Sequence, residues 1–559
     1  MILFIGDISL VGLAVSSTPP TEPVKSGVWK TITNTNSQIH ICDFSRKKDS
    51  FLELGQLSLA VSGQPVIGET RPEKSEQIAY IANALTNSNT QALGNANGVF
   101  CGFMHDRNTG TVRLFTDYLG FRQIYIYRTK ERLVFSNANW LINSYLKTEK
   151  LTLDIEGVVE LGTLGYPLAN RTQFKEVQLL PPAEVMTITP EGQVRTEQYF
   201  DITSTKQTTI TESEALEELH SIWKIAVHDR CAGTQKAFGF LSGGMDSRLL
   251  IHTLKACDIE TFTANYAPPK TRDRVFGEMS AHLMKIHHYQ HPSGSLLTDV
   301  RTETIEAWQA QSDIHTFFTE SPFIWSGDGG SVGMGHVYLT DEMSDLASQQ
   351  KFEECASLWC DENNRTIPTR LYRDTETKSK FQQRIADLMR IYGTKNPDRA
   401  PYYYLLLNDQ RRHLDKHYEI FHRRGFDLHL PFFDKRLIQF ISSLPSKLVN
   451  YHRIYDKLYK KISGELISTP WQTYPNHVPC PLSEPEKLKY QWSTEFHSIA
   501  EERQLITDHA KDCIKIAISK QFKKTLYNRP YLITASLLTL IGITNHAYLR
   551  NHIRAGIIE

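Results

Sequence analysis

The stretch Lys236–Leu250 constrains the fold of this chain more than any other, because it combines a short apolar run, a glycine turn and a helical pattern. Residues 236–241 are mostly apolar and end at the turn Ser-Gly-Gly (242–244), which is typical of a buried strand. Apolar residues then recur at helical spacing over 249–254. The sequence therefore predicts a strand, a loop and a helix in direct succession.

The loop between that strand and helix has the chemistry of a phosphate site. Gly243 and Gly244 would let the backbone approach a ligand closely and adopt positive φ. The hydroxyls of Ser242 and Ser247 can donate to phosphate oxygens, and the first amides of the helix attract an anion. Asp246 would repel a phosphate unless a cation lies between them, and magnesium is the obvious bridge. The alternative is a plain turn whose serine caps the helix.

This loop resembles the pyrophosphate loop of the asparagine-synthetase-like ATP pyrophosphatases, in which ATP is split between its α and β phosphates. It differs from a GxxxxGK[ST] loop, which is absent at this site. The apolar pattern predicts a helix over Glu212–His228 before the loop, and a strand over Thr261–Tyr266 and a helix over Phe276–Lys285 after it. This alternation predicts a doubly wound parallel sheet with its ligand at the carboxyl ends of the strands.

A second glycine-rich segment follows an apolar run that begins at Phe323. Five glycines in the nine residues Gly327–Gly335 exclude a packed helix or strand there, and a flexible surface loop is one interpretation. The segment also resembles the family's "SGEGSDELFGG", which covers the nucleotide and supplies a second magnesium ligand. The family's aspartate position is Ser331 here, a poorer magnesium ligand than a carboxylate, so Asp328 is the candidate to replace it.

The two segments and the resemblance together define the predicted site. The predicted metal ligands are Asp246 and Asp328. The residues predicted to bind ATP and its pyrophosphate are Leu241, Ser242, Gly243, Gly244, Asp246, Ser247, Ala264, Ser326, Gly327, Gly329 and Gly330.

Two further positions bear on the family resemblance. Residues 426–437 resemble its "RxPFLDxRLVEF" phrase, and Asp434 within them is predicted to cap a helix rather than to act in catalysis. Residues 468–473 stand where the family carries an Arg-x-Lys, but they contain no lysine. The nearest lysines are predicted to be solvated on a charged helix: Lys457, Lys460 and Lys461.

The first 205 residues follow a different pattern. Short alternating or β-branched runs recur about every ten residues up to Ile202, which predicts antiparallel sheets, and residues 75–85 predict a helix. Four phrases resemble, in order, those of the class II glutamine amidotransferase domain, and this resemblance implies the four-layer αββα (Ntn-hydrolase-like) fold. The phrases are Asn97–Phe100, Thr116–Tyr125, Phe135–Ala138 and Thr172–Ala183.

The catalytic residues of that amidotransferase domain do not match. The family's glutaminase uses an N-terminal cysteine whose own α-amine serves as base. Here residue 2 is Ile2 and the first cysteine is Cys42, while the family's glutamine-binding phrase is altered at Val61–Val66. We therefore expect a scaffold without glutaminase activity, as in the resembling β-lactam synthetases and lasso-peptide macrolactam synthetases, which also lack the cysteine.

Length and composition agree with a two-domain enzyme. A chain of 559 residues is too long for one core, and the predicted domains are 1–205 and 206–559. The 62 basic and 62 acidic side chains cancel, so we expect neither nucleic acid nor a membrane as a partner. Eight scattered cysteines indicate reduced thiols in a cytoplasmic protein.

Two apolar stretches could suggest a membrane or secretion. The N-terminus is apolar but carries Asp7 and no basic residue, which predicts a first strand rather than a signal peptide. Residues 531–544 are the most apolar stretch, but they are too short for a bilayer, which needs about 20 residues. They predict a buried helix.

The resemblance implies an enzyme that uses ATP and Mg²⁺ to activate a carboxylate as an acyl-adenylate, releasing pyrophosphate, for attack by an amine. The expected substrate is a small-molecule or peptide carboxylate with an amine acceptor, with macrolactam closure in natural-product biosynthesis as one use and a biosynthetic protein as a further partner. Two alternatives stay open: a glutamine- or ammonia-dependent asparagine synthetase, and a catalytically degenerate ATP-binding or scaffold partner. The sequence specifies neither substrates nor oligomeric state.

Overall fold

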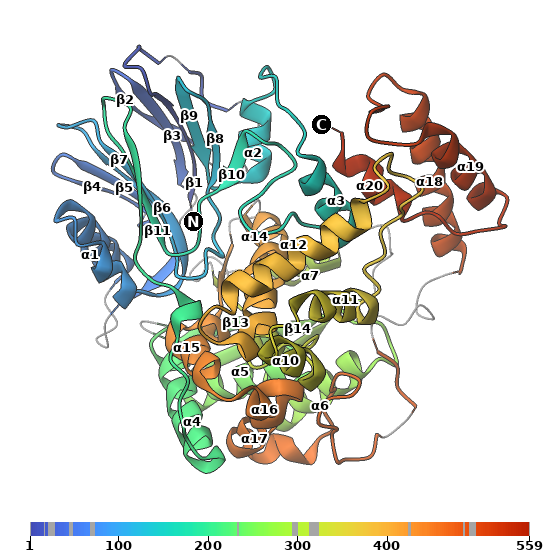
Figure 1. Cartoon of the computed structure of the whole chain (residues 1–559). Coiled ribbons are helices and arrows are strands. Elements are labelled where there is room, and N and C mark those ends of the chain that lie inside the picture. The colour runs from blue at the N-terminus through green and yellow to red at the C-terminus, as the bar shows by residue number, and fades with distance from the viewer. Residues whose placement is uncertain are drawn as a thin grey trace.

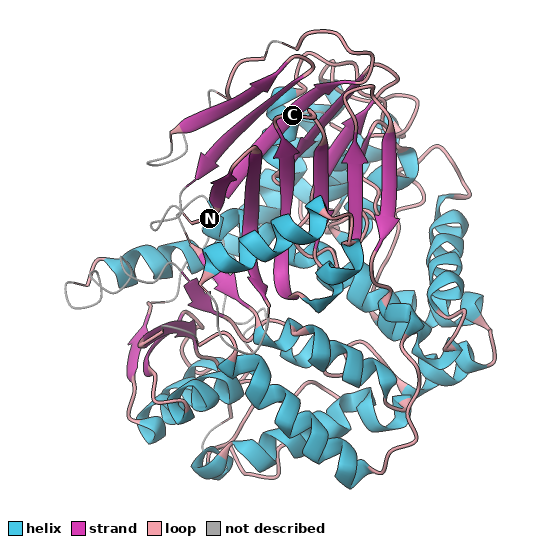
Figure 2. Ribbon diagram, turned by 90° about the vertical axis from the view of Figure 1, so that its left-hand side faces the viewer, coloured by secondary structure: helices cyan, strands magenta, loops and turns pink. Residues whose placement is uncertain are grey.

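The computed structural model describes residues 2–15, 17–20, 28–43, 49–67, 73–231, 234–292, 300–311, 323–422, 426–484, 487–490 and 499–557. Its N-terminal region contains two six-stranded sheets stacked face to face, and its C-terminal region contains a smaller sheet among many helices (Figure 1). Figure 2 shows the long strands gathered in the upper part of the molecule and helices filling the lower part.

The first N-terminal sheet is antiparallel and has the order β10-β8-β9-β1-β3-β2. One of its two central strands is the apolar N-terminus, which confirms the predicted first strand. The strands are β1 (Ile2–Ser9), β2 (Trp29–Asn34), β3 (Ser37–Asp43), β8 (Tyr125–Arg128), β9 (Arg132–Ser136) and β10 (Val177–Leu179).

The second N-terminal sheet is also antiparallel and has the order β12-β11-β7-β6-β5-β4. Apolar side chains fill the space between the sheets: the rings of Phe4 and Phe103, one from each sheet, have centroids 5.1 Å apart. The strands are β4 (Phe51–Leu54), β5 (Leu57–Val66), β6 (Asn97–Asp106), β7 (Val112–Thr116), β11 (Glu184–Ile188) and β12 (Val194–Gln198).

One helix covers the outer face of each sheet. α1 (Lys74–Thr86) buries Ile78 and Ile81 against the second sheet, and α2 (Asn139–Tyr145) buries Leu141 against the first. The predicted αββα arrangement is therefore confirmed.

The C-terminal region is built on a five-stranded sheet of order β15-β14-β13-β16-β17, in which every pairing is parallel. This confirms the parallel α/β architecture. The strands are β13 (Lys236–Phe240), β14 (Glu260–Asn265), β15 (His287–Gln290), β16 (Phe323–Trp325) and β17 (Asp427–His429), and the first helices are α4 (Glu212–His228), α5 (Met245–Ala256), α6 (Arg272–Met284) and α7 (Val300–Gln309).

The predicted helix from Phe276 begins four residues earlier, because the Thr271 side chain accepts a hydrogen bond from the Arg274 N–H and caps α6 there. The remaining helices are α3 (Ile155–Leu164), α9 (Gly330–Gly333), α10 (Asp341–Ser348), α11 (Phe352–Glu362), α12 (Thr377–Tyr392), α13 (Ala400–Tyr404), α14 (Arg411–His422), α15 (Lys435–Ser443), α16 (Ser446–Val449), α17 (Arg453–Ile462), α18 (Ile499–Ile518), α19 (Arg529–Leu540) and α20 (Leu549–Ala555).

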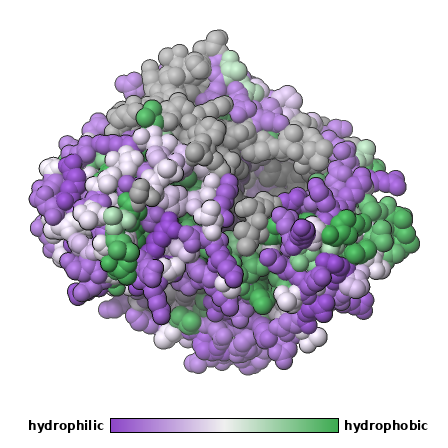
Figure 3. All heavy atoms as spheres, turned by 90° about the horizontal axis from the view of Figure 1, so that it is seen from above, coloured by the Kyte–Doolittle hydropathy of each residue, from purple (hydrophilic) through white to green (hydrophobic). Residues whose placement is uncertain are grey.

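The apolar stretch 531–544 forms helix α19, but the prediction that it is buried is wrong. Leu537 is 50% exposed, and Ile541 and Ile543, just beyond the helix, are 68% and 67% exposed. α19 packs against α18 on one side only, which leaves an apolar side in solvent. Figure 3 shows a group of apolar residues on the side of the molecule where Figure 1 places these two helices. Among the described residues, no helix is long and apolar enough to cross a membrane.

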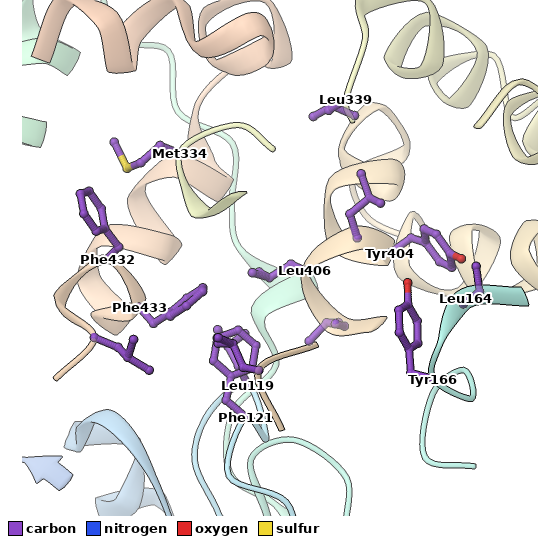
Figure 4. Close-up of a cluster of buried hydrophobic side chains, with 14 of the residues drawn as sticks. Leu119, Phe121, Leu164, Tyr166, Met334, Leu339, Tyr404, Leu406, Phe432 and Phe433 are labelled. Atoms are coloured by element: carbon purple, nitrogen blue, oxygen red, sulfur yellow. The ribbon is translucent and has the colours of Figure 1, made fainter. Parts of the chain in front are cut away.

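The two regions are joined through buried polar and aromatic contacts. Arg122 forms an ion pair with Asp427, and both side chains are almost fully buried. The Tyr118 hydroxyl donates to the carbonyl of Phe433 at 2.9 Å, and the rings of Phe121 and Phe433 have centroids 4.4 Å apart (Figure 4). The contacts thus join two of the sequence phrases, one from each region, into one core.

Candidate functional site

A pocket of about 550 Å³ lies at the carboxyl ends of β13, β14 and β16. Its place agrees with the expectation for a parallel sheet. Two of the predicted residues, Gly243 and Gly330, lie behind its wall. The predicted residues that line it are Leu241, Ser242, Gly244, Asp246, Ser247, Ala264, Ser326, Gly327, Asp328 and Gly329.

The two glycines of the first loop have different roles, and neither has the predicted positive φ. A Cβ on Gly243 would lie 2.3 Å from the Arg272 carbonyl oxygen, so only glycine lets the loop pack against the start of α6. Gly244 has an extended backbone (φ −76°), and a Cβ there would meet only Ser242 Oγ, at 3.5 Å. Its missing side chain therefore leaves bare backbone facing the pocket.

The serine hydroxyls hold the loop in shape. The Ser242 N–H donates to Ser247 Oγ at 2.9 Å, the two hydroxyl oxygens lie 3.1 Å apart, and the Gly244 N–H donates to Ser242 Oγ at 3.3 Å. Gly244 is the N-cap of α5, and none of the described side chains caps that helix end. The first-turn amides of α5 are therefore available to an anion in the pocket.

Asp246 lies in the first turn of α5 and accepts hydrogen bonds on both carboxylate oxygens. The Tyr455 hydroxyl donates to Oδ1 at 2.7 Å, and Ser331 donates to Oδ2 from its N–H at 2.9 Å and its hydroxyl at 2.8 Å. Burial raises the pKa of Asp246, these donors act in the opposite direction, and the charge of Asp328 raises it further. Ser331, which stands at the family's aspartate position, therefore donates to the Asp246 carboxylate and fixes its orientation.

The glycines of the second segment allow it to pack closely on α5. A Cβ on Gly330 would lie 2.4 Å from Asp246 Cγ, and a Cβ on Gly327 would lie 2.7 Å from the Ser247 nitrogen. The prediction that no helix forms here is wrong, because Gly330–Gly333 make one helical turn, α9. The contacts with α5 outweigh the poor helix propensity of glycine in so short a turn.

Asp328 is the second carboxylate at the pocket. Its Oδ2 lies 3.4 Å from Nδ1 of His417. Burial alone would raise the pKa of Asp328, but His417, Arg301 and the Ser326 hydroxyl together hold it well below its usual range. Asp328 is therefore ionised.

Asp246 and Asp328 fit the donor set of magnesium. They repel each other electrostatically, and a divalent cation shared with nucleotide phosphates would relieve that repulsion. No group of three or more His, Cys, Asp or Glu side chains suited to a metal occurs within the described part of the chain. Magnesium usually binds through one or two carboxylates, water and substrate phosphates, so two carboxylates are enough.

The N-terminal region also contributes residues to the wall of the pocket. Leu164 and Tyr166 line it (Figure 4). The Tyr166 hydroxyl donates to Asp409 Oδ1 at 2.7 Å. Asp409 lies on a π-helical turn, Leu405–Gln410, and its Oδ2 is 3.8 Å from His336 Nε2. Burial lowers the pKa of His336 to about 4, so its ring is neutral. The sequence interpretation identified none of these residues, since no motif marks them.

Another acidic residue that the sequence interpretation missed is Asp273, at the start of α6 behind Ser242. Burial raises its pKa to about 6, while contacts with Gln472, Gly243 and Ser242 act in the opposite direction. The only signal in the sequence was its place in the first turn of a helix.

Asp434 has the predicted capping role, whereas the three lysines that were predicted to be solvated each pair with an acidic side chain. Asp434 caps α15 by accepting from the Arg436 N–H, and it also forms a buried ion pair with Arg230. The three lysines of α17 form ion pairs and do not line the pocket: Lys457 with Glu212, Lys461 with Glu217, and Lys460 with the buried Asp456. All eight cysteines are free thiols.

Comparisons with known proteins agree with this architecture. Residues 77–200 match the glutamine amidotransferase domain family, and residues 218–462 match the asparagine synthase family. No curated protein matches the sequence.

Two solved structures are similar at low identity. One is a glutamine phosphoribosylpyrophosphate amidotransferase from B. subtilis complexed with ADP and GMP, at 10% identity over 51% of this chain and 84% of that one, with a TM-score of 0.23. The other is described as the allosteric regulatory enzyme of purine biosynthesis, at 11% identity over 43% of this chain and 54% of that one, with a TM-score of 0.22. From its two matched domains, the chain belongs to the asparagine-synthetase-like family.

Proposed function

We propose that the protein is an ATP-dependent, AMP-forming amide ligase. The observation that carries this proposal is the placement of Asp246, on the first turn of α5 beside the Ser242–Ser247 loop, in a pocket that Asp328 also lines. The asparagine synthase match supports a ligase, and the free amides of α5 support a phosphate ligand.

The proposed reaction has two steps. A carboxylate oxygen of the substrate attacks the α-phosphorus of ATP, the bond between the α and β phosphates breaks, and pyrophosphate leaves. The nitrogen of an amine then attacks the acyl carbon of the adenylate, the bond to AMP breaks, and the amine loses one proton as the amide forms. When bound, magnesium would neutralise phosphate charge, held by Asp246 and Asp328.

The protein's own contribution is positioning and exclusion of water. The α5 amides and the Ser242–Ser247 loop hold the departing pyrophosphate, and the tightly packed segment Gly327–Gly335 shields the adenylate from hydrolysis. Tyr455 and Ser331 fix the direction in which the Asp246 carboxylate faces.

The proposed substrate is a small-molecule or peptide carboxylate with an amine acceptor, and macrolactam closure in natural-product biosynthesis, with a biosynthetic partner protein, is one use of the reaction. The pocket volume of about 550 Å³ supports a small molecule or the end of a peptide as ligand. We place the reaction in the cytoplasm, for which the eight free thiols are suitable.

Pyrophosphate release tests the proposal. The full-length protein is incubated with ATP, Mg²⁺ and a panel of carboxylates and amines, and released pyrophosphate and AMP are measured. Asp246→Asn should lower the release of pyrophosphate by about 100-fold or more, because it removes one of the two carboxylate charges that would hold the magnesium ion. Asp361→Asn, which changes an exposed carboxyl of α11 outside the pocket, is the matched control. Undiminished release in Asp246→Asn would contradict the mechanism.

A further inference from the structure

We propose that helices α18, α19 and α20 form a surface that binds anionic membranes peripherally. The inference goes beyond the proposed function, because the described residues that line the ATP pocket all come from other elements. α18 and α19 pack against each other at one edge of the molecule (Figure 1). Their outer side is therefore open to a partner.

Three large aliphatic side chains stand in solvent at the end of α19. Leu537 and Ile541 are one helical turn apart, and the Ile541 N–H donates to the Leu537 carbonyl at 3.1 Å. Ile543 follows across Gly542, whose φ of +78° makes a turn in which a Cβ would meet none of the described atoms within 4 Å. We call these three side chains, each at least half exposed, the apolar stripe. Single exposed apolar residues are normal, but a continuous group marks a binding surface.

Helix α19 can lie on a membrane but cannot cross one. It has 12 residues, whereas a helix that spans a bilayer needs about 20. Its other face is occupied, because Leu532 and Ala535 are buried and α19 packs against α18. A helix with one packed face and one exposed apolar face is suited to the boundary between headgroups and acyl chains.

The same part of the chain carries an excess of positive charge. From Cys513 to Ile557 it contains no acidic residue and seven basic ones: Lys515, Lys520, Lys523, Lys524, Arg529, Arg550 and Arg554. Asp512 pairs with Arg550 and Arg554. The four lysines have no carboxylate partner among the described residues, and three of them are exposed. The charge cancellation of the whole chain, from which we expected no membrane partner, therefore does not extend to these helices.

An anionic bilayer fits both features better than another protein does. It offers acyl chains to the apolar stripe and headgroup phosphates to the lysines. A second copy of this chain would bring two sets of unpaired lysines into one contact, and like charges there oppose association. The cores of protein interfaces are rich in Trp, Tyr and Arg and poor in Lys, whereas this surface combines Leu and Ile with lysines.

Vesicle flotation with the full-length protein tests the proposal. Vesicles of phosphatidylcholine alone are compared with vesicles of equal parts phosphatidylcholine and phosphatidylglycerol. The wild type should bind the anionic vesicles about ten-fold or more tightly than the neutral ones. Raising the ionic strength from about 0.1 M to about 1 M should remove most of that difference, because salt screens exposed charges.

Removing the apolar stripe should weaken the binding. The triple variant Leu537→Ser/Ile541→Ser/Ile543→Ser should bind anionic vesicles about ten-fold or more weakly than the wild type. Its matched control is Ile391→Ser, which changes an exposed isoleucine near the end of α12 and should bind as the wild type does.

Removing the charges should have a similar effect. The triple variant Lys520→Gln/Lys523→Gln/Lys524→Gln should also bind about ten-fold or more weakly. The control is Lys147→Gln/Lys150→Gln, which changes two exposed lysines of the N-terminal region. Thermal unfolding should show that all variants are folded. Pyrophosphate release without vesicles should be the same in all of them, so its absence from the wild type would refute the proposed function alone.

The remaining outcomes overturn the membrane proposal. A wild type without preference for anionic vesicles, or a preference that survives in either triple variant, would do so. Sedimentation velocity then identifies the occupant. Self-association that the apolar-stripe variant abolishes would assign the surface to a second copy, and a monomeric wild type that binds no vesicles would assign it to a different protein.

Discussion

At the scale of single residues, the hydrogen bond from Tyr455 to Asp246 makes a testable prediction. The phenol stabilises the ionised carboxylate, so Tyr455→Phe should raise the pKa of Asp246. A hydrogen bond to a charged group contributes about 1.5–3 kcal/mol, which corresponds to a shift of roughly one to two pH units. Because the proposed reaction needs ionised Asp246, the acid limb of pyrophosphate release should move to higher pH by that amount.

Tyr459→Phe is the matched control for this measurement. Tyr459 lies one turn further along α17, is fully buried and does not line the pocket. The Tyr459→Phe variant should therefore show the same pH profile of pyrophosphate release as the wild type. An acid limb that is the same in Tyr455→Phe and the wild type would show that Tyr455 does not act on the group that limits the rate.

The same pair of residues shows what the sequence could predict. Asp246 was identifiable because the residues that define its loop lie within six positions of one another. Tyr455 was not, since it is 209 residues away and reaches Asp246 only through the packing of α17. Ser331 was interpreted as a lost metal ligand, and the structure shows that it donates to Asp246. Short-range motifs specify the loop chemistry, whereas the partners of each side chain depend on the fold.

At the scale of elements, the two adjacent glycines of the loop should respond differently to alanine. In Gly243→Ala the new Cβ would collide with the Arg272 carbonyl, so the variant should lose about 1–3 kcal/mol of stability. In Gly244→Ala the Cβ has room and the backbone is already extended, so the melting temperature should fall only slightly, by the small preference for glycine over alanine at an N-cap. That methyl group would instead occupy the face that a ligand approaches, and ATP affinity should fall.

Thermal unfolding and ATP calorimetry on both variants check this contrast, and each variant is the control for the other. Equal loss of stability in both would show that Gly244 is also needed for packing. Unchanged ATP affinity in Gly244→Ala would place the phosphates away from this loop.

Helices α9 and α19 show where sequence patterns stop being informative about elements. The run 531–544 is apolar enough to predict a helix, but hydropathy does not say how many neighbours surround it, and α19 has α18 on one side only. Glycine content excluded a helix over Gly327–Gly335, but close packing on α5 needs those glycines and one helical turn fits between them. In both cases tertiary contacts, which a local pattern does not contain, decided the outcome.

At the scale of the whole molecule, the N-terminal region does more than support the synthetase region. The sequence predicted a scaffold because the nucleophilic cysteine is absent from its expected place. The structure shows that Leu164 and Tyr166 from this region line the pocket, and that Tyr166 orients Asp409. Part of the pocket wall therefore depends on the joint between the two regions.

That joint contains a buried carboxyl that makes stability depend on pH. Glu160 on α3 is 2% exposed and lies 3.7 Å from Arg384 on α12. Burial raises its pKa to about 7, although Arg171 and the Leu168 N–H act in the opposite direction. The pKa of Glu160 is higher in the folded state than its unfolded value of about 4.3, so the folded protein binds the proton more tightly. The resulting gain in the free energy of unfolding is fully present below about pH 4.3 and is lost as the pH rises through 7.

Glu160→Gln should therefore flatten the fall in melting temperature between pH 5 and pH 8. The amide has no proton to lose. Over this range the free energy of unfolding of the wild type should therefore fall by about 2 kcal/mol more than that of the variant, and its melting temperature by about 2–4 °C more. Asp117, whose pKa burial raises to about 6, titrates in the same window in both proteins, so the difference between the two profiles is the quantity to measure. Glu156→Gln, on the same helix but 54% exposed at its side chain, should follow the wild type. Parallel profiles for wild type and Glu160→Gln would mean that Glu160 stays ionised in the joint, held by Arg171 and Arg384 rather than neutralised by burial.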